Sequence, residues 1–425
     1  MKIVKKIFHW IYALSLTPMI KVYFVYQDIK CWFIRVILGE LLSDETIRTS
    51  EGDVFCVFLL YQKYNIPDNV LNVMRELNEN GVQIIVVSNL KLNSVAKAEI
   101  SPYIKRLIIR RNIGRDFGGY RYGVLKVLDD YDPERLIILN DSVFYRREGL
   151  KEFISEMLKD RDFIGVAENY EFQYHVGSYA LSLGKKIISD KRFRQYWKRY
   201  KLSEVRPKVI KRGEMGLNKL IINKIGVKPY VIYSPYKLQD AIKKKGFDQL
   251  IDAYAAMPSK FISVCDDNIF ERLSSIAEEW YLSSGEEISR FVGNDKLSLE
   301  MADELFVRIT RVRAVSDLIG ISKDEIGKRV SDYNKEEITK EIIDFAMQGS
   351  QIHWAAALLV SYLNCPLIKN DLVVRLIYSP AELHYFAKYM SSDEYTEFLY
   401  IQTNRGVPTI HWKGFKRAML MLGYI

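Results

Sequence analysis

Short apolar segments alternate with segments of helical spacing through the first half of the chain, and this alternation limits the fold more than any other feature. The segment 54–60 is apolar throughout, and the segment 67–81 runs from a proline to a glycine with apolar residues on one helical face. Helical patterns recur at 117–128 and 150–158, and apolar segments of strand length recur at 82–87, 107–110, 135–139, 163–167, 179–183 and 227–233. Strands that are apolar on both sides need cover on both sides. The pattern therefore predicts an α/β fold, with a mostly parallel sheet and helices on both faces.

The character of the chain changes after about residue 267. Apolar strand segments nearly vanish there, and helical spacing dominates, for example from Ile269 to Trp280. A chain of 425 residues is also longer than one ordinary hydrophobic core supports. We therefore expect three parts: a basic amphipathic N-terminal segment at 1–45, an α/β domain at 46–266 and a mainly helical domain at 267–425.

Basic residues are concentrated in the middle of the chain. The segment 185–228 holds 15 basic and 3 acidic residues, an excess larger than the net charge of +9 for the whole sequence. Such a segment suits a diphosphate, a lipid head group, an anionic glycan or a nucleic acid, and the alternative is a solvated surface that aids solubility. Only the charge favours a nucleic acid, so we do not expect one.

The four cysteines lie far apart and form no CxxC pair. This spacing favours neither a zinc cluster nor a disulfide framework, and the simplest compartment for such a chain is a reducing cytoplasm.

The first 36 residues carry six basic side chains and one acid, Asp28. At helical spacing the cations of residues 2–9 share one face, and Ile3, Ile7, Trp10 and Leu14 share the other. The uncharged run between Lys6 and Lys21 has 14 residues, fewer than the ~20 that a membrane-spanning helix needs. Two interpretations stay open: a helix in the membrane interface, which would make the protein peripheral at the inner face of the cell membrane, and a helix packed on the protein's own core.

A glycine- and arginine-rich loop, residues 110–123, follows one strand segment and opens a helix. Each glycine inside a helix costs about 1 kcal/mol relative to alanine, so Gly118, Gly119 and Gly123 indicate that a strand or a ligand comes close to the backbone. The four arginines of the loop suit a phosphate group. Asp116 is well placed as the N-cap of the helix.

A second polar loop, Asn140-Asp141-Ser142, ends the apolar segment 135–139. Ligands of α/β folds bind beyond the carboxyl ends of the strands, and one carboxylate with the phosphates of a ligand is enough to hold Mg²⁺ or Mn²⁺. Asp141 is the candidate metal ligand. The alternative is a turn in which Asn140 or Asp141 bonds its own backbone.

Five motifs together resemble the rhamnan synthesis protein F family. They are Asn112-Ile-Gly-Arg-Asp-Phe-Gly-Gly-Tyr120, Leu139-Asn-Asp-Ser-Val-Phe144, Asp162-Phe-Ile-Gly165, His175-Val-Gly-Ser-Tyr-Ala180 and Gly213-Glu-Met-Gly-Leu217. The resemblance covers roughly 54–235. It implies a GT-A-like glycosyltransferase that moves rhamnose or a related sugar from a nucleotide-diphosphate donor to a growing bacterial cell-surface polysaccharide, with a polysaccharide or lipid-linked glycan as acceptor.

The sequence departs from that pattern at three places. The strand end at Ser88-Asn89 lacks the aspartate that many GT-A enzymes use to read the nucleotide base. Many GT-A enzymes have an Asp-x-Asp motif, but the second loop has one carboxylate, so a metal requirement stays open. The family often has tryptophan where this chain has Tyr120.

From the loops and the resemblance together we expect a nucleotide-sugar site. Its expected members are Asn112, Gly114, Arg115, Asp116, Gly118, Gly119, Asn140, Asp141, Ser142, Ser178 and Tyr179. The expected catalytic residues are Glu214, Asp116 and His175.

Glu214 is the expected base that takes the proton of the acceptor hydroxyl, with Asp116 and Glu168 as rivals. A carboxylate placed to suit a helix dipole is the other explanation of Glu214. Three other functions stay open: a non-catalytic glycan-binding or scaffold protein, a nucleotidyltransferase and a nucleic-acid binder.

Overall fold

The computed structural model describes residues 2–62, 64–244, 335–347, 349–375, 377–378 and 382–404, together with residues 413, 414 and 419. The expected boundary at 266, the expected helix at 269–280, Cys265 and His411 lie outside these residues.

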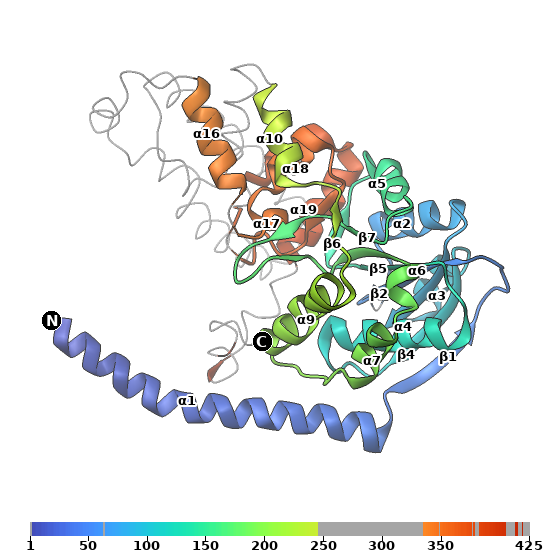
Figure 1. Cartoon of the computed structure of the whole chain (residues 1–425), viewed down its shortest axis with the longest axis horizontal. Coiled ribbons are helices and arrows are strands. Elements are labelled where there is room, and N and C mark those ends of the chain that lie inside the picture. The colour runs from blue at the N-terminus through green and yellow to red at the C-terminus, as the bar shows by residue number, and fades with distance from the viewer. Residues whose placement is uncertain are drawn as a thin grey trace, which may run out of the picture.

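One mixed sheet organises the described part of the chain (Figure 1). Its order is β1-β4-β3-β2-β5-β10-β7-β11, and only β1 and β10 run antiparallel to their neighbours. The bounds are β1 Leu41–Thr46, β2 Val54–Leu60, β3 Gln83–Ser88, β4 Ile104–Arg110, β5 Arg135–Asn140, β7 Phe163–Gly165, β10 Ala180–Gly184 and β11 Tyr230–Val231. The α/β fold with a mostly parallel sheet is confirmed. Strand β1, which has a polar centre, is not predicted by the apolar pattern.

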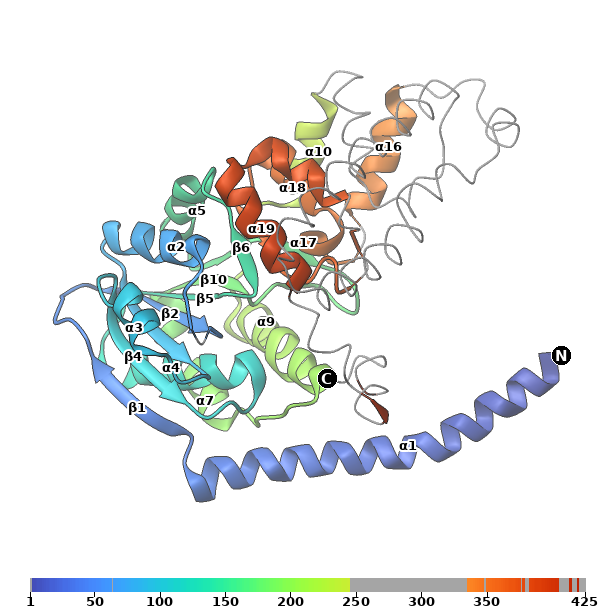
Figure 2. The same cartoon turned by 180° about the vertical axis from the view of Figure 1, so that it is seen from behind.

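The continuous apolar strands are explained by cover on both faces. In β2, Phe55, Val57 and Leu59 enter one buried cluster, while Cys56 and Phe58 enter the other. The first cluster contains α4 (Arg115–Asp130), α7 (Lys191–Arg199) and α9 (Met215–Lys219), and the second contains α2 (Asp68–Glu79), α3 (Ser94–Ile100) and α5 (Leu150–Met157). Figure 2 shows the same layers from behind.

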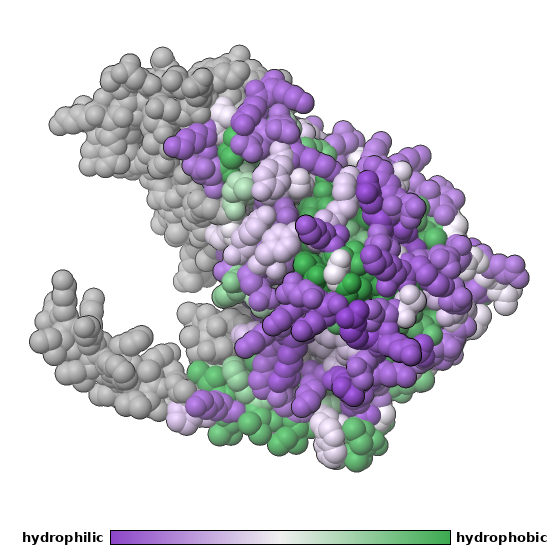
Figure 3. Space-filling view, in the orientation of Figure 1, coloured by the Kyte–Doolittle hydropathy of each residue, from purple (hydrophilic) through white to green (hydrophobic). Residues whose placement is uncertain are grey.

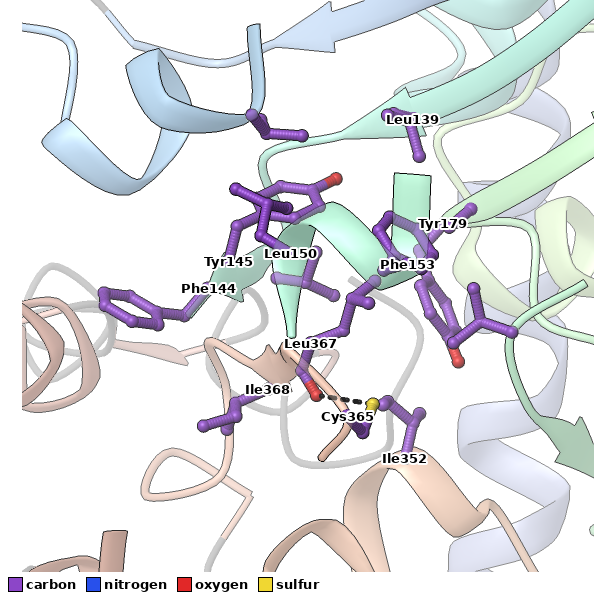
Figure 4. Packing of buried hydrophobic residues seen from close by; sticks show 14 of the residues in the cluster. Leu139, Phe144, Tyr145, Leu150, Phe153, Tyr179, Ile352, Cys365, Leu367 and Ile368 are labelled. Atoms are coloured by element: carbon purple, nitrogen blue, oxygen red, sulfur yellow. Dashed lines mark hydrogen bonds between the residues drawn. The ribbon is translucent and has the colours of Figure 1, made fainter. Parts of the chain in front are cut away.

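The described C-terminal residues are mainly helical, as expected. Their elements are α16 Lys335–Ala346, α17 Gln351–Trp354, α18 Ala356–Leu363, β12 Leu367–Lys369, η5 Glu382–Tyr389 and α19 Ser392–Asn404. Strand β12 pairs antiparallel with β6 (Val143–Tyr145), just beyond the second loop. Figure 4 shows Leu367 and Ile352 among the rings of Tyr145, Phe153 and Tyr179. The C-terminal elements therefore share a core with the sheet.

The path between β7 and the C-terminal region includes α6 (Lys185–Ile188), η3 (Leu220–Ile225), α10 (Pro235–Lys243) and four other short elements. These four are the two-residue strands β8 (Glu168–Asn169) and β9 (His175–Val176), the helix α8 (Arg206–Val209) and the π-helix η2 (Ile210–Glu214). The first two form a small antiparallel ribbon. The last two run into α9.

A long N-terminal helix, α1 (Lys2–Phe33), continues into the π-helix η1 (Ile34–Leu38) and runs away from the body of the molecule (Figures 1 and 2). One of its faces is docked. Asp28 accepts hydrogen bonds from the Ser203 hydroxyl at 2.7 Å and from Lys208 Nζ at 2.6 Å, and Cys31 is buried. Among the described residues, no helix combines the length and apolar character that crossing a bilayer requires.

Candidate functional site

The two loops predicted from the sequence lie together at the carboxyl edge of the sheet, and Tyr61 joins them. The Asn112 amide donates to the Tyr61 hydroxyl at 3.3 Å, and the Tyr61 backbone N–H donates to Asp141 Oδ2 at 2.8 Å. The side-chain amide of Gln62 donates to the same oxygen at 3.0 Å. The carboxylate of Asp141 therefore holds the segment that leaves β2 in place against both loops.

The first loop differs from its prediction at the start of the helix. The N-cap of α4 is Gly114, with φ at 78°, and Asp116 is an exposed residue of the first turn, so the N-cap prediction for Asp116 is wrong. The Gly114 N–H donates to Glu204 Oε1 at 2.6 Å, and Arg115 Nε donates to the Glu204 carbonyl at 2.9 Å. A neighbouring carboxylate thus does the capping, and a glycine takes the left-handed conformation that few other residues adopt.

Close packing inside the protein accounts for the glycines of α4. A Cβ at Gly118 would lie 2.1 Å from the Ile113 carbonyl oxygen, and a Cβ at Gly119 would lie 2.2 Å from a methyl carbon of Leu59. A Cβ at Gly123 would meet Val57 at 2.5 Å. Close approach of a strand, one of the two explanations that the sequence left open, fits Gly119 and Gly123. Gly118 instead lies against the loop that leads into α4.

Replacing Gly118 by alanine is expected to destabilise the protein by roughly 1–3 kcal/mol, because the added methyl would displace the Ile113 carbonyl, which accepts a hydrogen bond from Arg110. Urea unfolding measures the change. Gly216 in α9 is the matched control: the nearest atom to its Cβ is 3.4 Å away, so Gly216→Ala is expected to leave stability unchanged or raise it by up to about 1 kcal/mol. Equal effects at the two positions would contradict the packing explanation.

The arginines of the first loop hold protein groups. Arg110 is fully buried and donates to Asn89 Oδ1 at 2.7 Å and to the Ile113 carbonyl at 2.9 Å. Both Arg110 and Arg121 also form ion pairs with Glu40, at 3.3 and 2.7 Å. The guanidinium groups of these two arginines are already bonded to protein groups, so both residues are poor candidates for phosphate recognition.

The second loop is the turn that the sequence offered as the alternative to a ligand site. Asn140 Oδ1 accepts hydrogen bonds from the Ser142 backbone N–H at 3.0 Å and from the Ser142 hydroxyl at 2.6 Å. The Tyr145 hydroxyl donates to the Asn140 carbonyl at 2.7 Å. The turn is therefore fixed before any ligand binds.

A lysine from the C-terminal region, Lys369, completes the second loop. Its Nζ donates to the Ser142 hydroxyl at 3.0 Å and lies 4.2 Å from the centre of the Tyr179 ring. The next residue, Asn370, donates to the Asp141 carbonyl at 3.1 Å. The sequence gave no signal for either residue, because both lie more than 200 positions away and come into contact only through the pairing of β12 with β6.

The residues at this edge do not fit a divalent metal held by the protein alone. The second loop offers one carboxylate, and Oδ2 of Asp141 already accepts two N–H groups. The ammonium of Lys369 bonds the neighbouring serine, where it would repel a second cation. Within the described ranges, no three His, Cys, Asp or Glu side chains gather as metal ligands would.

His175 and Glu214, two of the predicted catalytic residues, form a pair. His175 Nε2 lies 3.5 Å from Glu214 Oε2, and His175 Nδ1 contacts the Gln173 carbonyl oxygen at 2.9 Å. A carbonyl and a carboxylate both accept protons, so both ring nitrogens are placed to donate. Burial by itself would lower the pKa of His175, but the hydrogen bond with Glu214 and the Gln173 carbonyl raise it above the ordinary value.

The carboxyl of Glu214 is held in its ionised form. Burial alone would raise its pKa, but the hydrogen bond and charge of His175, followed by the charges of Lys369 and His353, bring the pKa below the ordinary value of 4.5. The side chain of Glu214 is still 32% exposed, so a substrate can reach it. The charge of Lys369, the lysine of the second loop, thus also acts on the carboxyl of Glu214.

The pair makes stability depend on pH. The pKa of His175 is raised in the folded state, so its contribution is fully present below pH 6.5 and is lost as pH rises through the folded pKa. The pKa of Glu214 is lowered, so its contribution is present above pH 4.5 and is lost as pH falls. We expect His175→Gln to destabilise the protein most between these limits and least in alkaline solution, as measured by urea unfolding across pH. In a Glu214→Gln background this pH dependence should disappear, and its persistence would contradict the pairing.

The other predicted residues lie nearby with different neighbours. Ser178 and Tyr179 are buried just before β10, and the Tyr179 ring supports Lys369. Glu168, a rival base, is in β8 beside Tyr170 and Tyr174; burial and then this carboxylate raise the pKa of Tyr170 to about 12. Glu168 is therefore surrounded by phenol rings and is a weaker candidate than Glu214.

A cavity of about 740 Å³ opens beside Glu214, lined by the two residues that follow it in α9. Four cations, one acid and one exposed ring share its wall: Arg206, Lys211, Lys219, Arg375, Glu171 and Phe172. Three of the four cations belong to the basic segment 185–228, so part of that segment lines a cavity and is not only solvated surface.

Comparison with known proteins gives one family. Residues 84–257 match the model of a family described as rhamnan synthesis protein F. An uncharacterized protein, y4gN, of Sinorhizobium fredii (strain NBRC 101917 / NGR234) is 31% identical over 169 residues, which cover 38% of this chain and 44% of that relative. The chain thus spans less than half the length of that relative.

Two solved structures give only distant likenesses. HddC from Yersinia pseudotuberculosis has a TM-score of 0.23 and 17% identity over 32% of this chain and 79% of its own. A197 from STIV has a TM-score of 0.23 and 11% identity over 42% of this chain and 81% of its own. Neither likeness bears on function. The family match does: it includes both loops, His175 and Glu214, and over residues 84–257 it confirms the resemblance to rhamnan synthesis protein F that the order of the motifs predicted.

Proposed function

We propose that this protein is a glycosyltransferase of polysaccharide biosynthesis, which transfers a sugar such as rhamnose from a nucleotide-diphosphate donor to a glycan. The proposal rests on Glu214, a partly exposed carboxylate paired with His175 at 3.5 Å, and on Lys369, which bonds Ser142 of the second loop at 3.0 Å. A displacement at the anomeric carbon needs a base on the acceptor side and a positive charge at the departing diphosphate. The family match to rhamnan synthesis supports the same class of reaction.

In the proposed reaction the donor diphosphate lies at the second loop. The Lys369 ammonium, which the Ser142 hydroxyl oxygen holds at 3.0 Å, meets its oxygens. The sugar C1–O bond breaks, and its electron pair goes to the departing diphosphate oxygen, where the lysine charge stabilises it. Asp141 acts one step away, by holding Tyr61 and Gln62 in position with its Oδ2.

The acceptor enters from the cationic cavity beside Glu214 in this proposal. Its hydroxyl oxygen attacks the anomeric carbon while Glu214 takes the hydroxyl proton. His175 keeps the carboxylate ionised and oriented through the contact at 3.5 Å. The four cations of the cavity suit an acceptor that carries phosphate or anionic sugars, and the exposed ring of Phe172 suits a sugar face.

A screen of nucleotide-diphosphate sugars tests this function. The purified full chain is incubated with each donor and with glycan acceptors, and the release of nucleoside diphosphate is followed. We expect release with one donor class and a glycan product that is one sugar longer. Release of pyrophosphate from a nucleoside triphosphate would indicate nucleotidyl transfer instead. Glycan binding without turnover of any donor would indicate a binding protein and refute the proposal.

A further inference from the structure

The outer face of α1 is an unbroken apolar strip. Successive residues of a helix turn by about 100°, which places the exposed apolar side chains of α1 on one side of the helix. They are Met19, Val22, Val25, Tyr26, Ile29, Trp32 and Phe33, each between 47% and 69% exposed. The strip continues through η1 and the start of β1, and Figure 3 shows green apolar surface along the lower edge of the molecule. A soluble surface normally carries exposed apolar residues singly, whereas here seven large apolar side chains form one strip.

The opposite face of α1 is occupied by the protein. Gln27 and Cys31 are buried, and Asp28 is bonded to Ser203 and Lys208. The strip therefore cannot turn inward to cover itself without breaking these contacts. The described part of the helix therefore has two different faces: one is packed on the protein, and the other is exposed.

The charged side chains that border the strip are positive. By the same 100° rule, the exposed residues Lys21 and Lys30 fall on its two opposite edges. Asp28, the only acid of the described segment 18–38, lies on the docked side and is neutralised by Lys208.

We propose that this strip lies in the interface of an anionic lipid bilayer, with α1 parallel to the membrane surface. Apolar side chains and rings enter the boundary of the acyl chains, while lysines at both edges reach anionic head groups. A second copy of the chain fits the strip less well, because pairing two strips brings lysines of both copies together without acids to balance them. The inference is independent of the reaction that the protein catalyses.

Flotation of the full-length protein with vesicles tests the inference. Vesicles of phosphatidylcholine alone are compared with vesicles that also contain phosphatidylglycerol. We expect binding to the anionic vesicles and a loss of at least about tenfold in Ile29→Glu, because the centre of the strip no longer enters the lipid. Exchanging both Lys21 and Lys30 for glutamate is expected to cost more than about 25-fold on anionic vesicles, since each cation contributes about fivefold.

The matched control is Val95→Glu, which places the same charge on an equally exposed valine of α3, far from the strip. Val95→Glu should bind as the wild type does, and urea unfolding should show all variants folded. Equal binding of wild type and Ile29→Glu would overturn the inference. A wild-type protein that binds no vesicles would also overturn it. This holds whether light scattering finds the protein monomeric or finds a dimer that Ile29→Glu dissociates. Equal binding to neutral and anionic vesicles would overturn the role of the lysines.

Discussion

Replacing Glu214 by glutamine is expected to lower the turnover of sugar transfer by about 10²–10⁴-fold, the usual contribution of a positioned general base. The amide keeps the shape of the side chain and loses the charge that accepts a proton. The backbone of Glu214 should stay in place, because its carbonyl accepts from the Asn218 side chain at 2.9 Å whatever the side chain of residue 214 is. Transfer rates with the donor found in the screen measure the effect.

Glu168→Gln is the control for this experiment. Glu168 is a carboxylate in β8, the strand that pairs with the one holding His175, but its neighbours are Tyr170 and Tyr174. We expect it to lower turnover by less than about tenfold, as for a residue that does not take part in proton transfer. A large loss of turnover in Glu168→Gln, together with normal turnover in Glu214→Gln, would mean that Glu168 and not Glu214 is the general base. Binding of the donor, measured by calorimetry, should be unchanged in both variants, which separates loss of the base from loss of the fold.

The sequence predicted the fold class because the strands are apolar on both faces. The segment 54–60 became β2 with unchanged bounds, and its alternate residues feed two separate buried clusters. The segment 227–233 shortened to Tyr230–Val231 at the edge of the sheet, where one partner strand sets the length. Strand β1 was missed because an edge strand on the surface keeps polar residues such as Ser43 and Asp44.

The sequence also predicted that the two loops lie close together, because the carboxyl ends of parallel strands meet at one edge of the sheet. It did not foresee which groups fill the space between them. Glycines indicate close approach without naming the neighbour, and here the neighbour of Gly119 is Leu59. Arginines indicate an anion, and for Arg110 and Arg121 the anion is Glu40 of the protein itself. Local patterns therefore predicted that the two loops meet, but not which neighbours their residues contact.

Lys369 was beyond prediction for a different reason. It comes after an apolar dipeptide in a region whose spacing is helical, and a three-residue strand such as β12 leaves almost no periodic signal. Only the pairing of β12 with β6 brings the lysine to Ser142. The match to the family model ends at residue 257 and does not include this position.

Replacing Lys369 by methionine is expected to lower turnover by about 10²–10³-fold, the size of effect seen when one donor to a developing negative charge is removed. Methionine keeps the apolar length that lies over the Tyr179 ring and removes the ammonium 3.0 Å from Ser142. Turnover should fall more than the KM for the donor rises, because the charge on the diphosphate is greatest as the sugar leaves. Lys369→Arg should recover part of the rate, and Lys388→Met, an exposed lysine of η5, should leave it unchanged.

A chelator distinguishes this role from that of a metal. If Lys369 supplies the positive charge, EDTA should leave transfer near its starting rate and Lys369→Met should stay slow when Mg²⁺ or Mn²⁺ is added. The opposite pair of results, full loss with EDTA and normal turnover in Lys369→Met, would mean that a metal arrives with the nucleotide sugar and is bound at Asp141. That outcome would require Asp141 Oδ2 to release Tyr61 and Gln62 when the donor binds, since both now donate to it. The reaction would then depend on a rearranged loop, whereas the lysine mechanism uses the loop as it stands.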